Sequence, residues 1–214
     1  MKTVFPPHTP VTWPVEGRAE GFPVRRVFCV GKNYADHVAE MGGDVKRSEP
    51  VIFIKDAHCL VASGAEIAFP PATDDLHHEV ELVVAMGPGG VWGHAVGLDM
   101  TRRDLQARFK AKGGPWDRAK AFADSAPLGA FREGALVDGT EITLTVNGEV
   151  RQRSEIAKMI WGVGEIVDYL RADMGLGAGD LVFTGTPAGV GAVKRGDELV
   201  AEVTGLPGLR VRYL

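Results

Sequence analysis

The stretch that decides the fold, residues 75–87, reads Asp-Leu-His-His-Glu-Val-Glu-Leu-Val-Val-Ala-Met-Gly. Alternate side chains of an extended strand share a face, and one face of this stretch is apolar. The other face begins with His77, Glu79 and Glu81 and becomes hydrophobic at Val83. The pattern therefore predicts a strand that carries two carboxylates at the rim of a core.

These two carboxylates are candidate metal ligands. An unpaired carboxylate at the rim of a core is costly, so we expect a cationic partner for Glu79 and Glu81. Residues two apart on a strand lie roughly 6 to 7 Å apart, so both side chains can reach one ion. Oxygen ligands favour hard cations such as Mg²⁺, Mn²⁺ or Ca²⁺. The alternative is a solvated strand face, since charged residues are mostly exposed.

A third carboxylate follows the next expected strand. Residues 91–98 are mostly apolar, and Asp99 comes directly after them. Asp99 is therefore carried by a buried element rather than by a solvated loop. We predict that it is the third metal ligand.

A helix is expected shortly after Asp99. Thr101 is a good N-cap residue with Asp104 three positions later, which predicts a helix over residues 103–110, ended by Gly113-Gly114-Pro115. Arg103 and Gln106 share one face of this helix, close to Asp99. Donors beside a carboxylate-bound cation suit an anionic ligand. The alternative for Arg103 is a surface ion pair.

A histidine and a glutamate are predicted to form a general-base pair. After an expected strand at residues 24–30, residues 32–41 have room for a short helix, with Asn33 as N-cap and Gly42-Gly43 as its end. His37 and Glu40 are three positions apart, hence neighbours on one helix face. A carboxylate raises the basicity of an imidazole and orients it, as activation of water requires. The alternative is a surface pair.

Three further residues are candidates for the same site. Lys55 ends an expected strand at residues 51–55 and is a candidate substrate contact. Lys120 lies in a short apolar context, and lysines are seldom buried without a partner, so we place it at the acidic site. Thr186 lies in a Gly-rich loop after an expected strand. This loop lacks the lysine of a phosphate-binding loop, so a carboxylate is the expected ligand.

The composition favours an α+β fold that is mainly β. The 214 residues include 28 Gly and 13 Pro, which indicates many turns and short strands. Residues 141–153 predict a hairpin around Asn147-Gly148, residues 154–174 a helix, and residues 198–203 and 209–213 two strands. Residues 1–23 are expected to form an irregular leader and residues 24–214 a single domain.

Charge and segment composition argue against several classes of function. The net charge is −4 and there is no basic tract, so no nucleic-acid partner is expected. No apolar run approaches the roughly 18 residues of a membrane span, so we expect no membrane contact and a cytoplasmic location. Cys29 and Cys59 have hydrophobic neighbours and are expected to be reduced.

Five motifs, taken together and in this order, resemble the fumarylacetoacetate hydrolase family from about residue 24 to the C-terminus. They are Gly31-Lys32-Asn33-Tyr34-Ala35-Asp36-His37, His77-His78-Glu79-Val80-Glu81-Leu82, Leu98-Asp99-Met100-Thr101-Arg102-Arg103-Asp104-Leu105-Gln106, Pro115-Trp116 with Ala119-Lys120, and Phe183-Thr184-Gly185-Thr186-Pro187-Ala188-Gly189-Val190-Gly191. The resemblance is strongest to the short bacterial acylpyruvate hydrolases of the family. It implies a mixed β-sandwich roll with a few short helices, and a homodimer.

The resemblance also implies a cofactor, a substrate and a role for each candidate residue. The implied substrate is a 2,4-diketo acid such as 3-fumarylpyruvate, whose C–C bond is hydrolysed to give fumarate and pyruvate. The implied roles are Mg²⁺ or Mn²⁺ binding by Glu79, Glu81 and Asp99, water activation by His37 with Glu40, contacts to the reacting oxygens from Arg103, Gln106 and Lys120, and a loop contact to the substrate from Thr186.

Three alternatives stay open on the sequence alone. The same site could decarboxylate oxaloacetate, or it could isomerise or decarboxylate other 2-oxo acids of aromatic breakdown. In the third, the carboxylates bind a structural cation in a scaffold protein, which leaves the His37 and Glu40 pair unexplained.

Overall fold

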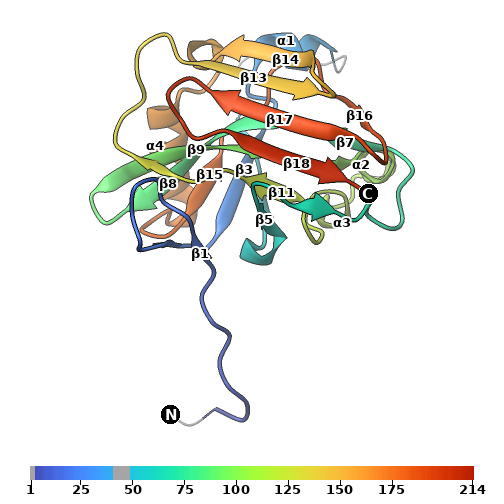
Figure 1. Ribbon diagram of the computed structural model, residues 1–214. Coiled ribbons are helices and arrows are strands. Elements are labelled where there is room, and N and C mark those ends of the chain that lie inside the picture. The colour runs from blue at the N-terminus through green and yellow to red at the C-terminus, as the bar shows by residue number, and fades with distance from the viewer. Residues whose placement is uncertain (1–2, 41–48) are drawn as a thin grey trace.

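The structure is a computed structural model, and it describes residues 3–40 and 49–214. Two sheets stack on each other and are joined by short helices and loops (Figure 1). The larger sheet has the order β4 (Val51–Lys55), β3 (Val27–Gly31), β15 (Leu181–Phe183), β8 (Val80–Gly87), β9 (Gly90–Leu98), β11 (Ala126–Leu128) and β5 (Leu60–Ala62), with β12 (Arg132–Glu133) paired to β9. The mainly β fold predicted from the sequence is confirmed.

The second sheet covers the upper face of the first in the view of Figure 1. Its order is β14 (Glu149–Glu155), β13 (Glu141–Val146), β17 (Glu198–Val203), β18 (Leu209–Tyr213) and β6 (Glu66–Ile67). Two smaller sheets comprise β10 (Thr101–Arg102), β7 (Leu76–His78) and β16 (Gly191–Val193), and β1 (Thr12–Trp13) with β2 (Phe22–Pro23). The helices are α1 (Ala35–Glu40), α2 (Arg103–Ala111), α3 (Asp117–Lys120), α4 (Val163–Met174) and the 3-10 turns Ala57–Cys59 and Ile156–Lys158.

The apolar face of β8 packs against two different neighbours in turn. Val80 and Leu82 belong to the core between the two sheets, where they meet residues of β13 and β17. Val84 and Met86, further along the same face, pack instead on α4. One face of the strand therefore contributes to two cores, which explains why its apolar pattern is so long.

The predicted strand over residues 75–87 is interrupted at Glu79. β7 ends at His78 and pairs with β10 and β16, whereas β8 begins at Val80 and pairs with β9 and β15. Between them, the carbonyl of Glu79 accepts a hydrogen bond of 2.8 Å from the amide of Asp99. This break turns the chain from one sheet to another and places Glu79 beside Asp99.

The helix expected over residues 154–174 is shorter than predicted. Residues 154 and 155 continue β14, where Glu155 pairs with Glu141 of β13, and the helix begins only at Val163. The apolar spacing of Ile156, Met159 and Ile160 fits a helix, but pairing with β13 determines where the strand ends.

Two predicted helix caps are also wrong. Thr101 lies in β10, and α2 has no side-chain cap at its first turn. Asn33 precedes α1, but its side chain bonds the backbone of Trp161 and Thr184. The predicted helix end at Gly42-Gly43 lies outside the described residues.

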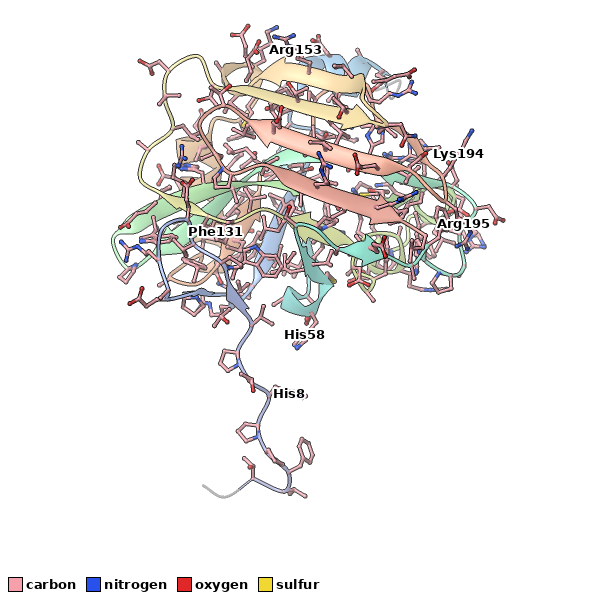
Figure 2. The ribbon with its side chains drawn as sticks, in the orientation of Figure 1. His8, His58, Phe131, Arg153, Lys194 and Arg195 are labelled. Carbon is pink, nitrogen blue, oxygen red and sulfur yellow. The ribbon has the colours of Figure 1, made fainter. Side chains whose placement is uncertain are left out.

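The N-terminal part of the chain has two regions. Residues 12–23 contain the short β1–β2 pair, and Trp13 and Phe22 are buried in a core shared with β3 and β15. Val4 and Phe5, before this pair, are exposed, and the segment leads away from the body (Figure 1). His8 lies on this segment (Figure 2), and its ring centroid is 6.3 Å from that of His58.

Among residues 3–40 and 49–214, no helix has the length and apolar character needed to cross a membrane.

Asp180 fixes the start of β15, the strand that leads into the Gly-rich loop. Its carboxylate accepts hydrogen bonds from Arg25, Arg26 and the amide of Gly177. Burial alone would raise the pKa of Asp180, but these donors outweigh it and lower the pKa to about 2. The interaction therefore stabilises the fold above about pH 4 and is lost as the pH falls toward 2.

We expect Asp180→Asn to lower the free energy of unfolding at pH 7 by about 1 to 2 kcal/mol, since both arginines are partly exposed. The deficit should shrink when urea unfolding is repeated at decreasing pH between 4 and 2. A variant with the same deficit at pH 7 and pH 2.5 would contradict this account.

Candidate active site

Three carboxylates converge at the junction of the two sheets. Glu79 lies between β7 and β8, Glu81 lies on β8, and Asp99 follows β9. All three are buried, and one oxygen from each lies within 4.8 Å of the other two. The structure thus brings together the three residues that the sequence suggested as metal ligands.

Lys120 joins two of these carboxylates. Its Nζ donates to Glu79 at 2.7 Å, to Asp99 Oδ2 at 2.6 Å and to the Thr101 hydroxyl at 2.6 Å. An ammonium group has three N–H donors, so all of them are engaged. Burial alone would lower the pKa of Lys120, but Asp99 and Glu79 outweigh it and raise the pKa, so this lysine stays charged.

Lys55 lies beneath the carboxylates. It is fully buried, and its Nζ is 2.9 Å from Asp99 Oδ1. Its donors point to the carbonyls of Met100, Lys120 and Ser125 and to the Ser125 hydroxyl. The sequence suggested that Lys55 contacts the substrate, but in the structure its side chain does not line the cavity described below.

The protonation of the carboxylates is uneven. Burial opposes ionisation of Glu79, but Lys120 and Arg103 outweigh it and hold its pKa well below the usual range. Burial and the neighbouring charges of Asp99 and Glu79 raise the pKa of Glu81, which accepts one hydrogen bond, from the Gly185 amide. Of the three carboxylates, Glu81 therefore has the least compensating positive charge near it.

These features fit a bound divalent cation. Asp99 Oδ1 is buried and accepts no hydrogen bond among the described residues, although Lys55 lies near it. The second oxygen of Glu81 accepts no hydrogen bond from residues 3–40 or 49–214, and burial and nearby carboxylates oppose the charge of Glu81. A hard divalent ion that binds both oxygens and Glu79 would offset these costs, and oxygen-only sites suit Mg²⁺ and Mn²⁺.

His37 faces the same cavity from α1. Burial lowers the pKa of His37, so its imidazole is neutral near pH 7. Its Nδ1 lies 3.4 Å from Glu40 Oε2. Since a carboxylate can only accept, Nδ1 carries the proton and Nε2 is left as the proton acceptor.

Glu40 also attaches α1 to the Gly-rich loop. Both of its oxygens lie 3.1 Å from the amide nitrogen of Gly189, which donates to them. Gly189 has φ +94°, and a Cβ there would lie 2.1 Å from the Arg151 carbonyl oxygen, so only glycine fits. The contact joins the helix that carries His37 to the loop that carries Thr186.

Glu40→Ala removes the orienting group of His37 and this attachment together. We expect turnover to fall by about tenfold, because the imidazole loses one weak hydrogen bond but stays in place. Hydrogen exchange of the α1 amides should become faster. Asp36→Asn, an exposed change on the same helix, is the control and should alter neither quantity.

A cavity of about 230 Å³ connects these residues. Eight of the ten residues predicted for the site line it: His37, Glu79, Glu81, Asp99, Arg103, Gln106, Lys120 and Thr186. Apolar side chains form another part of the wall, namely Val30, Val38, Phe53 and Trp116. A ligand with one anionic end and one apolar or flat end suits such a cavity.

The amide of Gln106 is oriented by Arg103. Arg103 Nη1 donates to Gln106 Oε1 at 2.6 Å, and Nη2 donates to Glu79. The amide nitrogen of Gln106 makes no hydrogen bond within the described part of the chain, so its two N–H groups are available to a ligand.

Several supporting residues were missed in the sequence. Asn33 ties the segment before α1 to the loop at Thr184, Thr101 and Ser125 hold the two lysines, and Gln152 contacts Thr186. Each acts over a long separation in the chain, so no local pattern revealed it.

The chain is similar to known enzymes over most of its length. Residues 26–213 match the family model "Fumarylacetoacetate (FAA) hydrolase C-terminal". The mitochondrial oxaloacetate tautomerase FAHD1 of Rattus norvegicus is 41% identical over 202 residues, covering 88% of this chain and 91% of the relative. The fumarylpyruvate hydrolase of Ralstonia sp is 41% identical over 181 residues, covering 78% and 94%.

A solved structure gives a further match. Fumarylpyruvate hydrolase from Pseudomonas aeruginosa, in complex with Mn²⁺ and pyruvate, is 46% identical, with a TM-score of 0.94 over 100% of this chain and 99% of that one. The fold and these matches thus define an enzyme class, and the three clustered carboxylates could hold a metal ion. The chain belongs to the fumarylacetoacetate hydrolase family.

Proposed function

We propose that this protein hydrolyses the C–C bond of an acylpyruvate, with 3-fumarylpyruvate as the first candidate substrate. The observation that carries the proposal is a neutral His37, oriented by Glu40, which lines the same cavity as three buried carboxylates. The similarity to a fumarylpyruvate hydrolase over the full chain supports the choice of substrate.

Glu79, Glu81 and Asp99 would hold a divalent cation, Mg²⁺ or Mn²⁺. When bound there, the cation would supply Lewis-acid stabilisation of the negative charge that develops on the pyruvate half of the substrate. Lys120 and Lys55 hold Glu79 and Asp99 in position. In this proposal both lysines act through Glu79 and Asp99, since the donors of Lys120 are already engaged.

His37 supplies the base. Its Nε2 takes a proton from water, and the resulting hydroxide adds to the C4 carbonyl of the substrate. Glu40 holds the imidazole so that Nδ1 keeps its proton during the transfer. The lowered pKa of His37 keeps the imidazole unprotonated before the reaction.

Arg103 and Gln106 stabilise the negative charge that forms next. Addition of hydroxide produces a tetrahedral oxyanion at C4, and both side chains line the cavity in which it forms. Each such donor is worth roughly 3 to 4 kcal/mol elsewhere. The C3–C4 bond then breaks, and its electron pair stays on the pyruvate half. C4 becomes a carboxyl carbon of fumarate, and C3 takes a proton to give pyruvate.

A second candidate function is tautomerisation of oxaloacetate. The 41% identity to an enzyme of that name favours it. Here His37 would move a proton between C3 and the C2 oxygen, with no water added and no C–C bond broken. The same residues suffice, so the products decide between the two functions.

A substrate panel tests both candidates. The purified protein with Mn²⁺ or Mg²⁺ is given fumarylpyruvate, acetylpyruvate and oxaloacetate, and enol absorbance and released pyruvate are followed with and without EDTA. Hydrolysis releases one pyruvate per acylpyruvate consumed. Faster keto–enol exchange of oxaloacetate without pyruvate release would favour the tautomerase, and oxaloacetate loss with CO₂ release would favour decarboxylation. No turnover of any of the three would refute the proposal.

The predicted homodimer remains a prediction, which light scattering of the purified protein would test.

A further inference from the structure

Gln152 is the buried exception on an exposed strand. Of the seven residues of β14, it alone is buried, at 1% exposure. It does not line the cavity, and the mechanism above does not use it. A buried amide on an otherwise solvated strand needs partners for both of its ends.

Both ends of the Gln152 amide are hydrogen-bonded. Oε1 accepts from the Val80 amide at 3.1 Å and lies 2.9 Å from His78 Nδ1. Nε2 donates to the Pro187 carbonyl at 2.9 Å and to the Thr186 hydroxyl oxygen at 2.8 Å. The side chain therefore connects β8 to the Gly-rich loop.

The orientation of this amide is fixed by backbone groups. The Val80 amide can only donate, and the Pro187 carbonyl can only accept. Exchanging the oxygen and nitrogen of Gln152 would set donor against donor and acceptor against acceptor. His78 must then carry its proton on Nδ1, since Oε1 can only accept.

The fixed amide determines the direction of the Thr186 hydroxyl. A hydroxyl normally can donate or accept. Thr186 Oγ1 accepts from Gln152, and among the described residues it makes no other hydrogen bond, so its own proton is uncommitted. Thr186 lines the cavity and is 3% exposed, so that proton can only be used there.

We propose that Gln152 is a positioning residue that makes the Thr186 hydroxyl a donor to an oxygen of the bound 2-oxo acid. The nature of the ligand rests on the proposed function. The direction of the Thr186 proton does not. This arrangement favours ligands with a carbonyl or carboxylate oxygen at that point and disfavours ligands with an N–H or O–H there.

Pyruvate binding to the Mn²⁺-loaded protein, measured by titration calorimetry, tests the proposal. In Gln152→Glu the new side chain cannot donate and instead accepts the Thr186 proton, so the Kd for pyruvate should rise about 10- to 100-fold. Thr186→Val should do the same, and Thr186→Ser, which keeps the hydroxyl, should stay within about threefold of the wild type.

Two comparisons separate positioning from general damage. The double variant Gln152→Glu with Thr186→Val should bind pyruvate no more weakly than Thr186→Val alone. Both changes remove the same donor, the Thr186 hydroxyl, so their effects should not add. Val150→Glu adds a carboxylate to an exposed position of β14, outside this network, and should leave the Kd unchanged. A folded Gln152→Glu protein with wild-type affinity, effects that multiply in the double variant, or a Thr186→Ser loss equal to that of Thr186→Val would overturn the proposal.

A neutron structure of the deuterated wild-type protein gives an answer that needs neither turnover nor a variant that folds. We expect density for a deuteron on Thr186 Oγ1 that points into the cavity, and another on His78 Nδ1. A Thr186 deuteron directed at Gln152 would refute the inference. Inactivity on every 2-oxo acid would refute the proposed function but leave this result standing.

Discussion

Glu81→Gln should abolish tight Mn²⁺ binding and reduce turnover by at least about 10³-fold, because several kcal/mol of charge stabilisation depend on the cation. The substitution keeps the shape of the side chain and removes the charge of one of the three proposed ligands. The Gly185 amide can still donate to the remaining carbonyl oxygen. Mn²⁺ affinity by titration calorimetry and turnover of the best substrate are the measurements.

The same substitution should not destabilise the metal-free protein. Burial and the charges of Asp99 and Glu79 raise the pKa of Glu81, so ionising it opposes folding. That cost is absent below the usual glutamate pKa and grows as the pH rises from there toward the raised pKa, so metal-free Glu81→Gln should unfold at the same or a higher temperature at pH 8. Glu66→Gln, at an exposed position of β6, is the control. Mn²⁺ affinity equal to the wild type would show that Glu81 is not a ligand.

His37→Ala should lower kcat by about 10²- to 10⁴-fold, the usual contribution of a positioned general base. Mn²⁺ affinity should stay close to the wild-type value, because His37 is not one of the three proposed metal ligands. The two variants together therefore divide the site: Glu81→Gln should lose both metal and turnover, and His37→Ala only turnover. Asp36→Asn is again the matched control.

The pH profile gives a second readout for His37. Burial holds its pKa below the ordinary histidine value, so wild-type activity should persist on the acidic side until the imidazole is protonated. In His37→Ala the acidic limb due to this group should disappear from the profile of residual activity. A His37→Ala enzyme with near-normal turnover would remove the proposed base for both candidate reactions.

The sequence was most informative where the chemistry lies on a regular local pattern. The alternation around Glu79 and Glu81, the apolar strand before Asp99 and the three-residue spacing of His37 and Glu40 each depend on backbone geometry within one element. The Asn147-Gly148 hairpin was predicted for the same reason, and the structure has it with Asn147 at φ 52°.

The remaining features depend on contacts between distant segments. The break at Glu79 exists because the Asp99 amide, 20 residues later, bonds its carbonyl. Gln152 meets the Thr186 hydroxyl across 34 residues. Lys55 looks like a residue at the end of a strand, and only the packing of Asp99, Met100 and Ser125 around it shows that it is buried beneath the site. No window of sequence contains both members of these pairs.

The residues that line the cavity come from parts of the fold that differ in their tolerance to substitution. Glu81 lies on β8, and Glu79 and Asp99 lie at the ends of paired strands that fix their spacing, whereas Lys110 belongs to the short helix α2 and Trp116 to the segment before α3. If the proposed function holds, random mutagenesis confined to those two positions should therefore change which acyl groups are accepted and leave the carboxylate cluster in place. Diversifying β8 or β9 should mostly give proteins that no longer assemble the site.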